Sequence, residues 1–180
     1  MFMISILIPT YNNLDYLKLC IKSLKNNSKY EHELIFHIND GSDGTLDFIK
    51  NFGYKYSHSE KNIGLCSAIN KAANLSNQKY ILYSHDDMYF CPDWDKVLLD
   101  EVNRLNHDSF YLSGTMIEPN SGHIVHDFGI DFNTFKEDDL LSKYKNINFY
   151  DHQGTHFAPH LVSKKCGIKW AVLAKNLILV

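Results

Sequence analysis

Short apolar runs alternate with longer stretches of helical periodicity through the first hundred residues, and this alternation restricts the fold more than any other feature. Strands are expected at residues 4–8, 34–38, 54–57 and 80–83, the first of them stopping at Pro9. Apolar runs of this length, bounded by polar residues, are typical of buried strands. Strands that alternate with helices form a mostly parallel sheet with helices on both faces. The sequence therefore predicts an α/β fold of this kind.

The intervening stretches carry apolar residues at helical spacing, and each has a polar side chain placed to cap its first turn. These expected caps are Asn13, Asp43, Asn62 and Asp93. In the second helix, Leu46, Ile49 and Phe52 are expected to face inward, and Gly53 to end the helix.

The pattern changes after about residue 110. A strand over 110–117, a turn over 118–122 and a return strand over 123–125 predict a hairpin. The stretch 131–145 is polar, as expected for a long irregular surface loop over a site. No linker divides the chain, so residues 1–180 are expected to form a single domain.

The composition excludes several classes of protein. A chain of 180 residues with 44% hydrophobic residues is typical of a globular domain, and a net charge of -3 argues against a nucleic-acid partner. Four well-separated cysteines predict free thiols in a reducing compartment. The apolar run at 2–8 is too short for a signal sequence, so a cytoplasmic protein is expected. The apolar tail, 170–180, predicts a terminal core element, with docking to the inner face of the membrane as the alternative.

Asp86 and Asp87 directly follow the predicted strand at 80–83. Adjacent carboxylates at the end of a buried strand repel each other and are costly to desolvate, and a bound cation relieves both problems. Mg²⁺ and similar ions typically take one or two protein carboxylates and complete their shell with phosphates and water. The pair therefore predicts a divalent cation site, and a solvated Asp-Asp turn is the alternative.

Other polar side chains follow the first two strands. Open α/β sheets bind ligands at the carboxyl ends of their strands, so Thr10, Tyr11 and Asp40 are expected near the acid pair. Tyr11 can stack on a base, and Asp40 can accept the imide N–H of uracil or thymine. The alternative for Asp40 is a role confined to its own turn.

Asn62 and Gly64 flank a helix start, where backbone N–H groups favour anions; taken alone, these residues are more simply explained by capping and a tight turn. The chain has neither of the glycine-rich loops typical of nucleoside-triphosphate hydrolysis or of dinucleotide binding. A diphosphate would then be held through a metal ion, which favours group transfer from a nucleotide-activated donor.

The sequence resembles the family-two glycosyltransferases, which have the GT-A fold. Four segments carry the resemblance over residues 4–94: Ser5 to Asn12, Asn39 to Thr45, Asn62 to Gly64 with Ala68 and Asn70, and His85 to Met88 with Pro92 and Trp94. The resemblance implies a nucleotide-sugar-binding half at 1–109 and an acceptor-side half at 110–180 that is incomplete or divergent, because the family pattern is lost after Lys165.

The resemblance also implies roles for individual residues. Donor-binding residues would be Pro9, Thr10, Tyr11, Asp40, Asn62, Gly64 and Asp86, and Asp87 would bind Mn²⁺ or Mg²⁺. Apart from the resemblance, Asp86 and His156 are further metal candidates. The implied reaction moves a sugar, with inversion, from a UDP- or dTDP-type donor to a saccharide or glycolipid acceptor, as in polysaccharide biosynthesis.

The general base that such a reaction needs is less well marked. Its candidates are Asp127, Asp131 and Asp138, together with Glu137 and Asp139. His152, His156 and His160 recur every fourth residue, but Gly154 and Pro159 make a helical zinc face improbable. Two alternatives stay open: a nucleotidyltransferase that makes such donors, and a donor-binding remnant without transfer activity.

Overall fold

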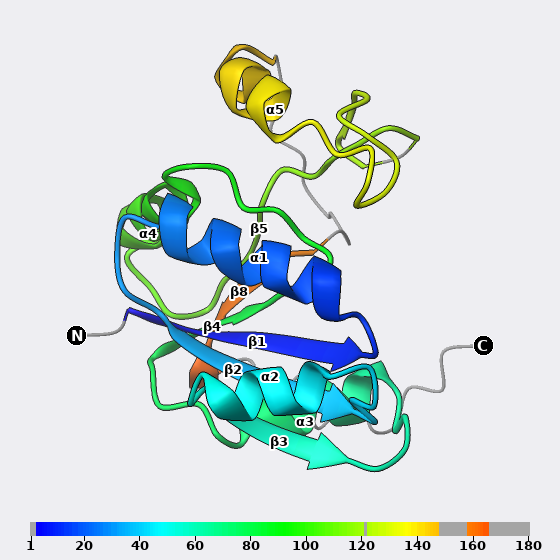
Figure 1. Ribbon diagram of the computed structural model, residues 1–180. Helices are drawn as coiled ribbons and strands as arrows, with labels where there is room; N and C mark the ends of the chain where they lie inside the picture. The colour runs from blue at the N-terminus through cyan, green and yellow to red at the C-terminus, as the bar shows by residue number, and fades with distance from the viewer. Residues whose placement is uncertain (1–2, 121, 148–157, 166–180) are drawn as a thin grey trace.

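The computed structural model describes residues 3–120, 122–147 and 158–165, and its centre is a six-stranded sheet (Figure 1). The strand order is β3-β2-β1-β4-β8-β5. The strands β1 to β4 are parallel, and β8 runs antiparallel between β4 and β5. Their bounds are Ile4–Tyr11 for β1, Glu33–Asn39 for β2, Lys55–Ser59 for β3, Tyr80–Tyr83 for β4, Tyr111–Ser113 for β5 and His160–Ser163 for β8. The predicted mostly parallel sheet is confirmed.

Helices cover both faces of this sheet, because its side chains alternate between two apolar clusters. Ile6, Phe36 and Leu82 belong to the larger cluster, which also contains residues of α1, α2 and α4. Leu7 and Ile35, one position along each strand, pack with α3 on the other face. The helix bounds are Leu14–Asn27 for α1, Thr45–Asn51 for α2, Leu65–Ala73 for α3 and Trp94–Leu105 for α4.

The first strand does not stop at Pro9 but continues to Tyr11. Leu7 O accepts a hydrogen bond from Ser84 N, on the side of β4. Because alternate residues point to the same side, Pro9 also faces that side, where β4 has already ended at Tyr83. A proline there costs no ladder hydrogen bond, so the strand can extend toward the ligand edge.

Two expected helix caps make no side-chain capping bond, namely Asn13 and Asp93. The α1 cap is supplied from a distant loop, since Asp43 accepts from Leu14 N at 2.9 Å and from Thr45 N at 3.0 Å. Asp43 therefore ties together the starts of α1 and α2. Asn62 does not cap α3. It precedes the N-cap, Gly64, and its side chain accepts from Gly64 N.

The prediction for the end of α2 is right for Gly53 and wrong for Phe52. Gly53 has a left-handed φ of 68°, and the next amide, Tyr54 N, donates back to Ile49 O, as expected of a glycine-terminated helix. Phe52 is not inward-facing: its side chain is 63% exposed and stacks on Tyr54. The helix ends at Asn51, so Phe52 has left the helical face on which Ile49 is buried.

The predicted hairpin in the second half is wrong. Two short strands, β6 (Ile117–Glu118) and β7 (Ile124–Val125), are present but run parallel. β5 ends at Ser113, where Gly114 N still donates to Pro159 O, and Met116 O accepts from both His123 N and Ile124 N. The Met116 bonds hold the start of β7 beside β6, and the two strands run in the same direction.

The stretch expected to be irregular contains α5 (Glu137–Lys143) and a 3-10 turn, η1 (Tyr144–Asn146). The acids in the first turn of α5 favour a helix start, and Leu140 is the buried residue of this helix. Residues 115–120 and 122–147 stand above α1 in Figure 1 and are called the lobe below. The lobe contacts α1 through Lys22–Glu137 and Tyr16–Phe132.

No helix within the three described ranges is long and apolar enough to cross a membrane. The apolar tail at 170–180 lies outside the described residues, and so do His152 and His156. His160 lies in a strand, β8, and not on a helix.

Candidate functional site

The carboxyl ends of β1 and β2 carry the expected base-binding residues. Tyr11 pairs in register with Asn39, so the Asp40 turn follows directly beside Tyr11 and Asn12. Asn12 Nδ2 donates to Asp40 Oδ2 at 3.1 Å, and Ser42 N donates to Asp40 Oδ1 at 3.1 Å. These bonds lower the pKa of the exposed Asp40 carboxyl, so it is held ionised as an oriented acceptor.

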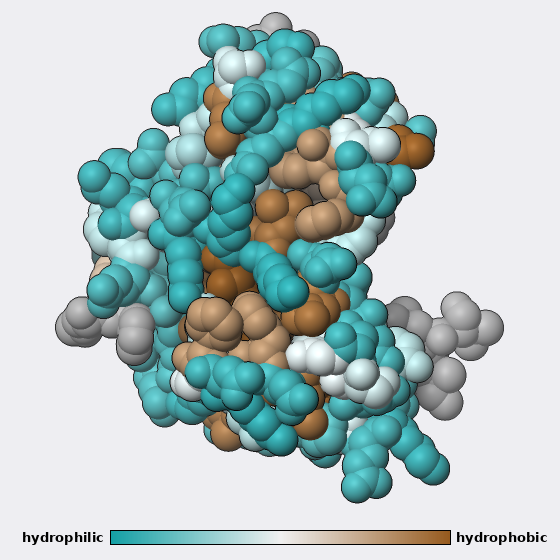
Figure 2. All heavy atoms as spheres, in the orientation of Figure 1, coloured by the Kyte–Doolittle hydropathy of each residue, from teal (hydrophilic) through white to brown (hydrophobic). Residues whose placement is uncertain are grey.

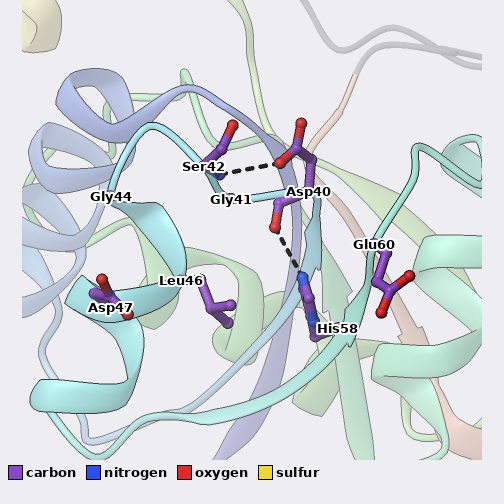
Figure 3. A pocket seen from close by; sticks show the side chains of 8 residues that line it. All are labelled: Asp40, Gly41, Ser42, Gly44, Leu46, Asp47, His58 and Glu60. Atoms are coloured by element: carbon purple, nitrogen blue, oxygen red, sulfur yellow. Dashed lines mark hydrogen bonds between the residues drawn. The ribbon is translucent and has the colours of Figure 1, made fainter.

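Asp40 lies on the rim of a pocket of about 390 Å³. The pocket is lined by Asp40, Gly41, Ser42, Gly44, Leu46, Asp47, His58 and Glu60 (Figure 3). The His58 ring nitrogen Nε2 lies 2.8 Å from Asp40 O and must donate, because a carbonyl can only accept. Figure 3 shows the Asp40 carboxylate on the opposite side, toward Ser42. The carbonyl is thus fixed to β3 and the carboxylate remains accessible.

The tight turn after Asp40 depends on Gly41, whose φ is 87°. A Cβ at this position would lie 2.8 Å from Ile38 Cγ2 and 2.9 Å from Leu46 Cβ. Both the backbone conformation and the lack of space therefore require glycine.

Thr10 and Tyr11 differ in how they meet this edge. Thr10 is 3% exposed, and its Oγ1 has no hydrogen-bond partner within the described part of the chain. Tyr11 is 52% exposed, which leaves its ring available for stacking. Pro9, the third expected residue of this strand end, is buried within β1.

Asn39 was not expected to do more than precede Asp40. It accepts from Ile63 N at 3.0 Å and from Ser59 Oγ at 3.2 Å through the same Oδ1. This amide connects the end of β2 to the loop before α3. It thereby sets the position of Asn62 and Gly64, whose turn is exposed beside the start of α3.

The acid pair follows β4 as predicted, with Asp86 half-buried and Asp87 exposed. Burial raises the pKa of Asp86, and the charge of Asp87 raises it further, while the side chains of Thr10 and Asn13 counter the rise in part. Asn13 therefore serves the acid pair and not the helix start where it was expected. The pair is an electrostatically unfavourable arrangement that a cation would relieve.

Neighbouring groups feel the same negative field. Burial raises the pKa of Tyr83, and the charges of Asp87 and Asp86 raise it further; the buried Cys20 thiol is affected in the same way. Tyr83 OH lies 2.6 Å from His85 Nε2, just before the acids. A diphosphate would be repelled from this edge unless a cation lay between the two sets of charges.

The donor set fits a hard divalent ion that is completed by its ligand. Within the described ranges, no group of three or more His, Cys, Asp or Glu side chains is placed to hold a metal ion. Mg²⁺ and its analogues often use one or two carboxylates together with substrate phosphates. The acid pair satisfies that requirement, while His156 lies outside the described residues.

The candidate bases are all in the lobe. Asp131 accepts from Asn133 N and from both the backbone and the hydroxyl of Thr134, and these Thr134 bonds lower its pKa. A lowered pKa makes a weaker base. Asp127 bonds Gly129 N.

The remaining acids of the lobe are on α5. Glu137 pairs with Lys22 and Asp139 pairs with Lys143, while Asp138 is exposed. The identity of the base remains a prediction.

A three-residue network joining the lobe to the acid-pair loop was not predicted from the sequence. Glu137 Oε2 lies 2.7 Å from Lys22 Nζ, and Tyr89 OH donates to Glu137 Oε1 at 2.9 Å. Burial raises the pKa of Tyr89 to about 12, and Glu137 contributes to the rise. These residues belong to α1, α5 and the loop after Asp87, so only the fold brings them together.

Comparison with known proteins places this geometry in a family. A glycosyltransferase of Rickettsia typhi is 28% identical over 170 residues, which cover 92% of this chain and 53% of that protein. The chain thus spans about half the length of the curated relatives it matches.

Among solved structures, S. aureus TarS 1-349 in complex with UDP-GlcNAc has a TM-score of 0.59 at 21% identity, covering 67% of this chain and 38% of that one. The mannosyltransferase PcManGT from Pyrobaculum calidifontis, in complex with GDP-Man and Mn²⁺, has a TM-score of 0.54 at 16% identity, covering 64% of this chain and 36% of that one. At these identities the two structures support the fold alone.

The family match itself runs from the first strand of the sheet to the last. Residues 5–162 match the family described as Glycosyl transferase family 2, a range that includes both the Asp40 turn and the acid pair. Because this range covers most of the chain, the protein belongs to glycosyl transferase family 2.

Proposed function

We propose that this chain transfers a sugar, with inversion, from a UDP- or dTDP-type donor to a hydroxyl of a saccharide or glycolipid acceptor, assisted by Mn²⁺ or Mg²⁺. One observation carries the proposal: the same edge of the sheet presents Asp40, an oriented hydrogen-bond acceptor for a nucleobase, and the electrostatically unfavourable pair Asp86 and Asp87. The donors bound by TarS and PcManGT, UDP-GlcNAc and GDP-Man, support a nucleotide-sugar in general.

The pyrimidine preference follows from hydrogen-bonding chemistry. The Asp40 carboxylate is acceptor-only, because its pKa is lowered by Asn12 and Ser42. Uracil and thymine offer an imide N–H to such an acceptor. Tyr11 provides a ring for the base to stack on, and Thr10 Oγ1 is a polar atom that still needs a partner.

Asp87, with Asp86 beside it, would hold the cation. When bound, the cation would supply positive charge to the diphosphate as it leaves. Asn13 and Thr10 partly offset the rise in the pKa of Asp86, which favours its ionised form beside the proposed donor. The exposed turn at Asn62 and Gly64, at the start of α3, offers backbone N–H groups to the donor.

The proposal is tested by UDP release from a panel of UDP-sugars in Mn²⁺ and in EDTA. Wild-type protein should release UDP in Mn²⁺, and Asp87→Asn should lower that rate by about a hundredfold, the order seen when one group that stabilises developing charge is removed. Equal rates in the two proteins, or in Mn²⁺ and EDTA, would contradict the proposal.

Asp100→Asn is the matched control for this experiment. Asp100 is an exposed acid of α4 that pairs with Lys96, so the same change of charge is made away from the sheet edge. Its UDP-release rate should equal that of wild type. A loss in both variants would indicate a nonspecific charge effect.

A further inference from the structure

The turn that carries Asp40 has a backbone conformation that few side chains adopt. Asp40 has a left-handed φ of 60°, and Gly41, the next residue, has a φ of 87°. Aspartate tolerates this region better than most residues do, but for any residue except glycine it costs free energy. Figure 2 shows mostly hydrophilic and pale atoms at the surface around the start of α2, which this turn precedes. The turn therefore depends on polar contacts to keep its shape.

The peptide group that joins Asp40 to Gly41 is held at both ends. Its carbonyl accepts from His58 Nε2 at 2.8 Å, and its N–H donates to Asn12 Oδ1 at 2.8 Å. His58 belongs to β3, whereas Asn12 follows β1, and these two strands lie on opposite sides of β2. Because Gly41 has no Cβ, its own conformation does not prevent this peptide plane from rotating. The two hydrogen bonds fix the orientation of the plane.

The orientation of this peptide group affects the Asp40 carboxylate through Asn12. Asn12 Oδ1 accepts from Gly41 N, while Asn12 Nδ2 donates to Asp40 Oδ2 at 3.1 Å. An amide oxygen only accepts and an amide NH₂ only donates, so this pair of bonds allows one orientation of the Asn12 side chain. If the peptide plane rotated, the first bond would break and the second would lose its support. His58 therefore acts on the carboxylate although it contacts only the carbonyl of the same residue (Figure 3).

His58 is placed so that its ring can be replaced without opening the core. It is half-buried in the edge strand of the sheet, and it lines the pocket of about 390 Å³ beside Asp40. The backbone of Asp40 is tied to β3 independently of this ring, because Asp40 N donates to Ser59 O at 2.8 Å. Loss of the His58 side chain should therefore leave the strand in place and free only the peptide plane.

We infer that His58 is a positioning residue for nucleobase recognition: it fixes the Asp40–Gly41 peptide group and so keeps the Asp40 carboxylate directed at the imide N–H of the base. The identity of the ligand rests on the proposed function, whereas the hold on the turn exists without a ligand. Uracil offers an imide N–H at the ring position where cytosine carries a lone pair. The oriented carboxylate therefore favours UDP over CDP.

The test compares two amide side chains of different length at this position. Glutamine carries its NH₂ near the place of histidine Nε2 and the shorter asparagine near that of Nδ1, so only glutamine can reach Asp40 O. In calorimetric titrations with Mn²⁺, His58→Asn should lower UDP affinity about fivefold, part of what a hydrogen bond to a charged group contributes, and leave CDP affinity unchanged. His58→Gln should stay within about twofold of wild type for both nucleotides, because it keeps the hydrogen bond.

Two further variants complete the comparison. His58→Leu has no donor, so it should lose UDP affinity as His58→Asn does and keep its CDP affinity. His107 is exposed beyond the end of α4, so His107→Asn, the matched control, should bind both nucleotides as wild type does. An unchanged ratio of UDP affinity to CDP affinity in His58→Asn, or a His58→Gln variant that behaves like His58→Asn, would overturn the inference.

Hydrogen exchange of the Gly41 amide in the ligand-free proteins separates this inference from the proposed function. Exchange should be about fivefold faster in His58→Asn than in wild type and unchanged in His58→Gln. If exchange changes in this way while wild type binds neither nucleotide in Mn²⁺, the proposed function fails and the hold of His58 on the turn stands. If wild type binds UDP in Mn²⁺ but either the exchange or the affinity ratio is the same in His58→Asn as in wild type, the inference fails and the proposed function stands.

Discussion

Asp86 places stability and ligand binding in opposition at a single residue. Its carboxyl is half-buried beside Asp87, so its ionised form is disfavoured in the protein without a cation. Asp86→Asn removes this cost and keeps a polar side chain for Thr10 and Asn13. We expect the melting temperature in chelator to rise by about 2 °C, roughly the shift that 1 kcal/mol gives in a chain of this size, while Mn²⁺-dependent UDP affinity falls.

The pH dependence follows from the sign of the shift. The folded-state pKa of Asp86 is raised, so its contribution to stability is fully present below the unfolded pKa and is lost as pH rises through the folded pKa. The stability gained by Asp86→Asn should therefore appear at neutral pH and vanish under acid conditions. A gain that persists unchanged in acid would contradict the electrostatic cause.

Asp40 carries the prediction about the base. Asp40→Asn replaces an acceptor-only group by one that also donates, so UDP affinity should fall about tenfold or more, the loss expected for a hydrogen bond to a charged group. Asp47→Asn, at another acid of the same pocket, should leave UDP affinity unchanged. The measurement is competition between UDP and GDP on each protein. Clear preference of the wild type for GDP would refute the pyrimidine assignment.

At the level of elements, α5 is fastened to α1 and to the acid-pair loop by Glu137. The hydrogen bonds from Lys22, and then from Tyr89, lower the pKa of Glu137, so its contribution is present above the unfolded pKa and is lost as pH falls through the lower folded pKa. Glu137→Gln should speed proteolytic cleavage within the lobe at neutral pH and cost at most about 1 kcal/mol, because the pair is partly exposed.

Glu101→Gln is the control for the Glu137 substitution. Glu101 pairs with Arg104 inside α4, so its loss breaks an ion pair without uncoupling two elements. Cleavage of the lobe should then match wild type. If Glu137→Gln is cleaved in the lobe at the same rate as wild type, the bonds of Glu137 do not hold the lobe in place.

The strands near the site could be predicted because burial shows directly in local sequence. The run at 80–83 is apolar throughout and β4 has those bounds, so Asp86 and Asp87 fall where expected. Polar partners could not be predicted, since they depend on which distant loop approaches. Asn13 is a suitable cap for α1, yet Asp43 takes that role and Asn13 serves Asp86.

The burial of a charged side chain is a second feature that could not be predicted from the sequence. Asp95 lies on α4 and is fully buried, accepting from Lys29 N, Tyr30 N and His32 Nε2. In the sequence it is an ordinary acid in the first turn of a helix. Its role appears only when the loop after α1 is folded against α4.

For the whole molecule, the fold divides the proposed work between two regions. Residues 1–109 supply the strand ends that present Asp40 and the acid pair. The lobe lies above α1 in Figure 1. The division at residue 109 stays a proposal about function. Donor binding should depend on the sheet edge, and discrimination between acceptors on the lobe.

A divalent cation on the acid pair should join a uridine diphosphate to this edge of the sheet. Thermal unfolding of the intact chain should be measured with UDP in Mn²⁺, with UDP in chelator and with Mn²⁺ alone. A ligand present at about a hundred times its dissociation constant adds about 2.7 kcal/mol to stability. We predict a rise of several degrees with UDP and Mn²⁺ together and almost none with either alone. An equal rise with UDP in chelator, or no rise with both, would contradict the account.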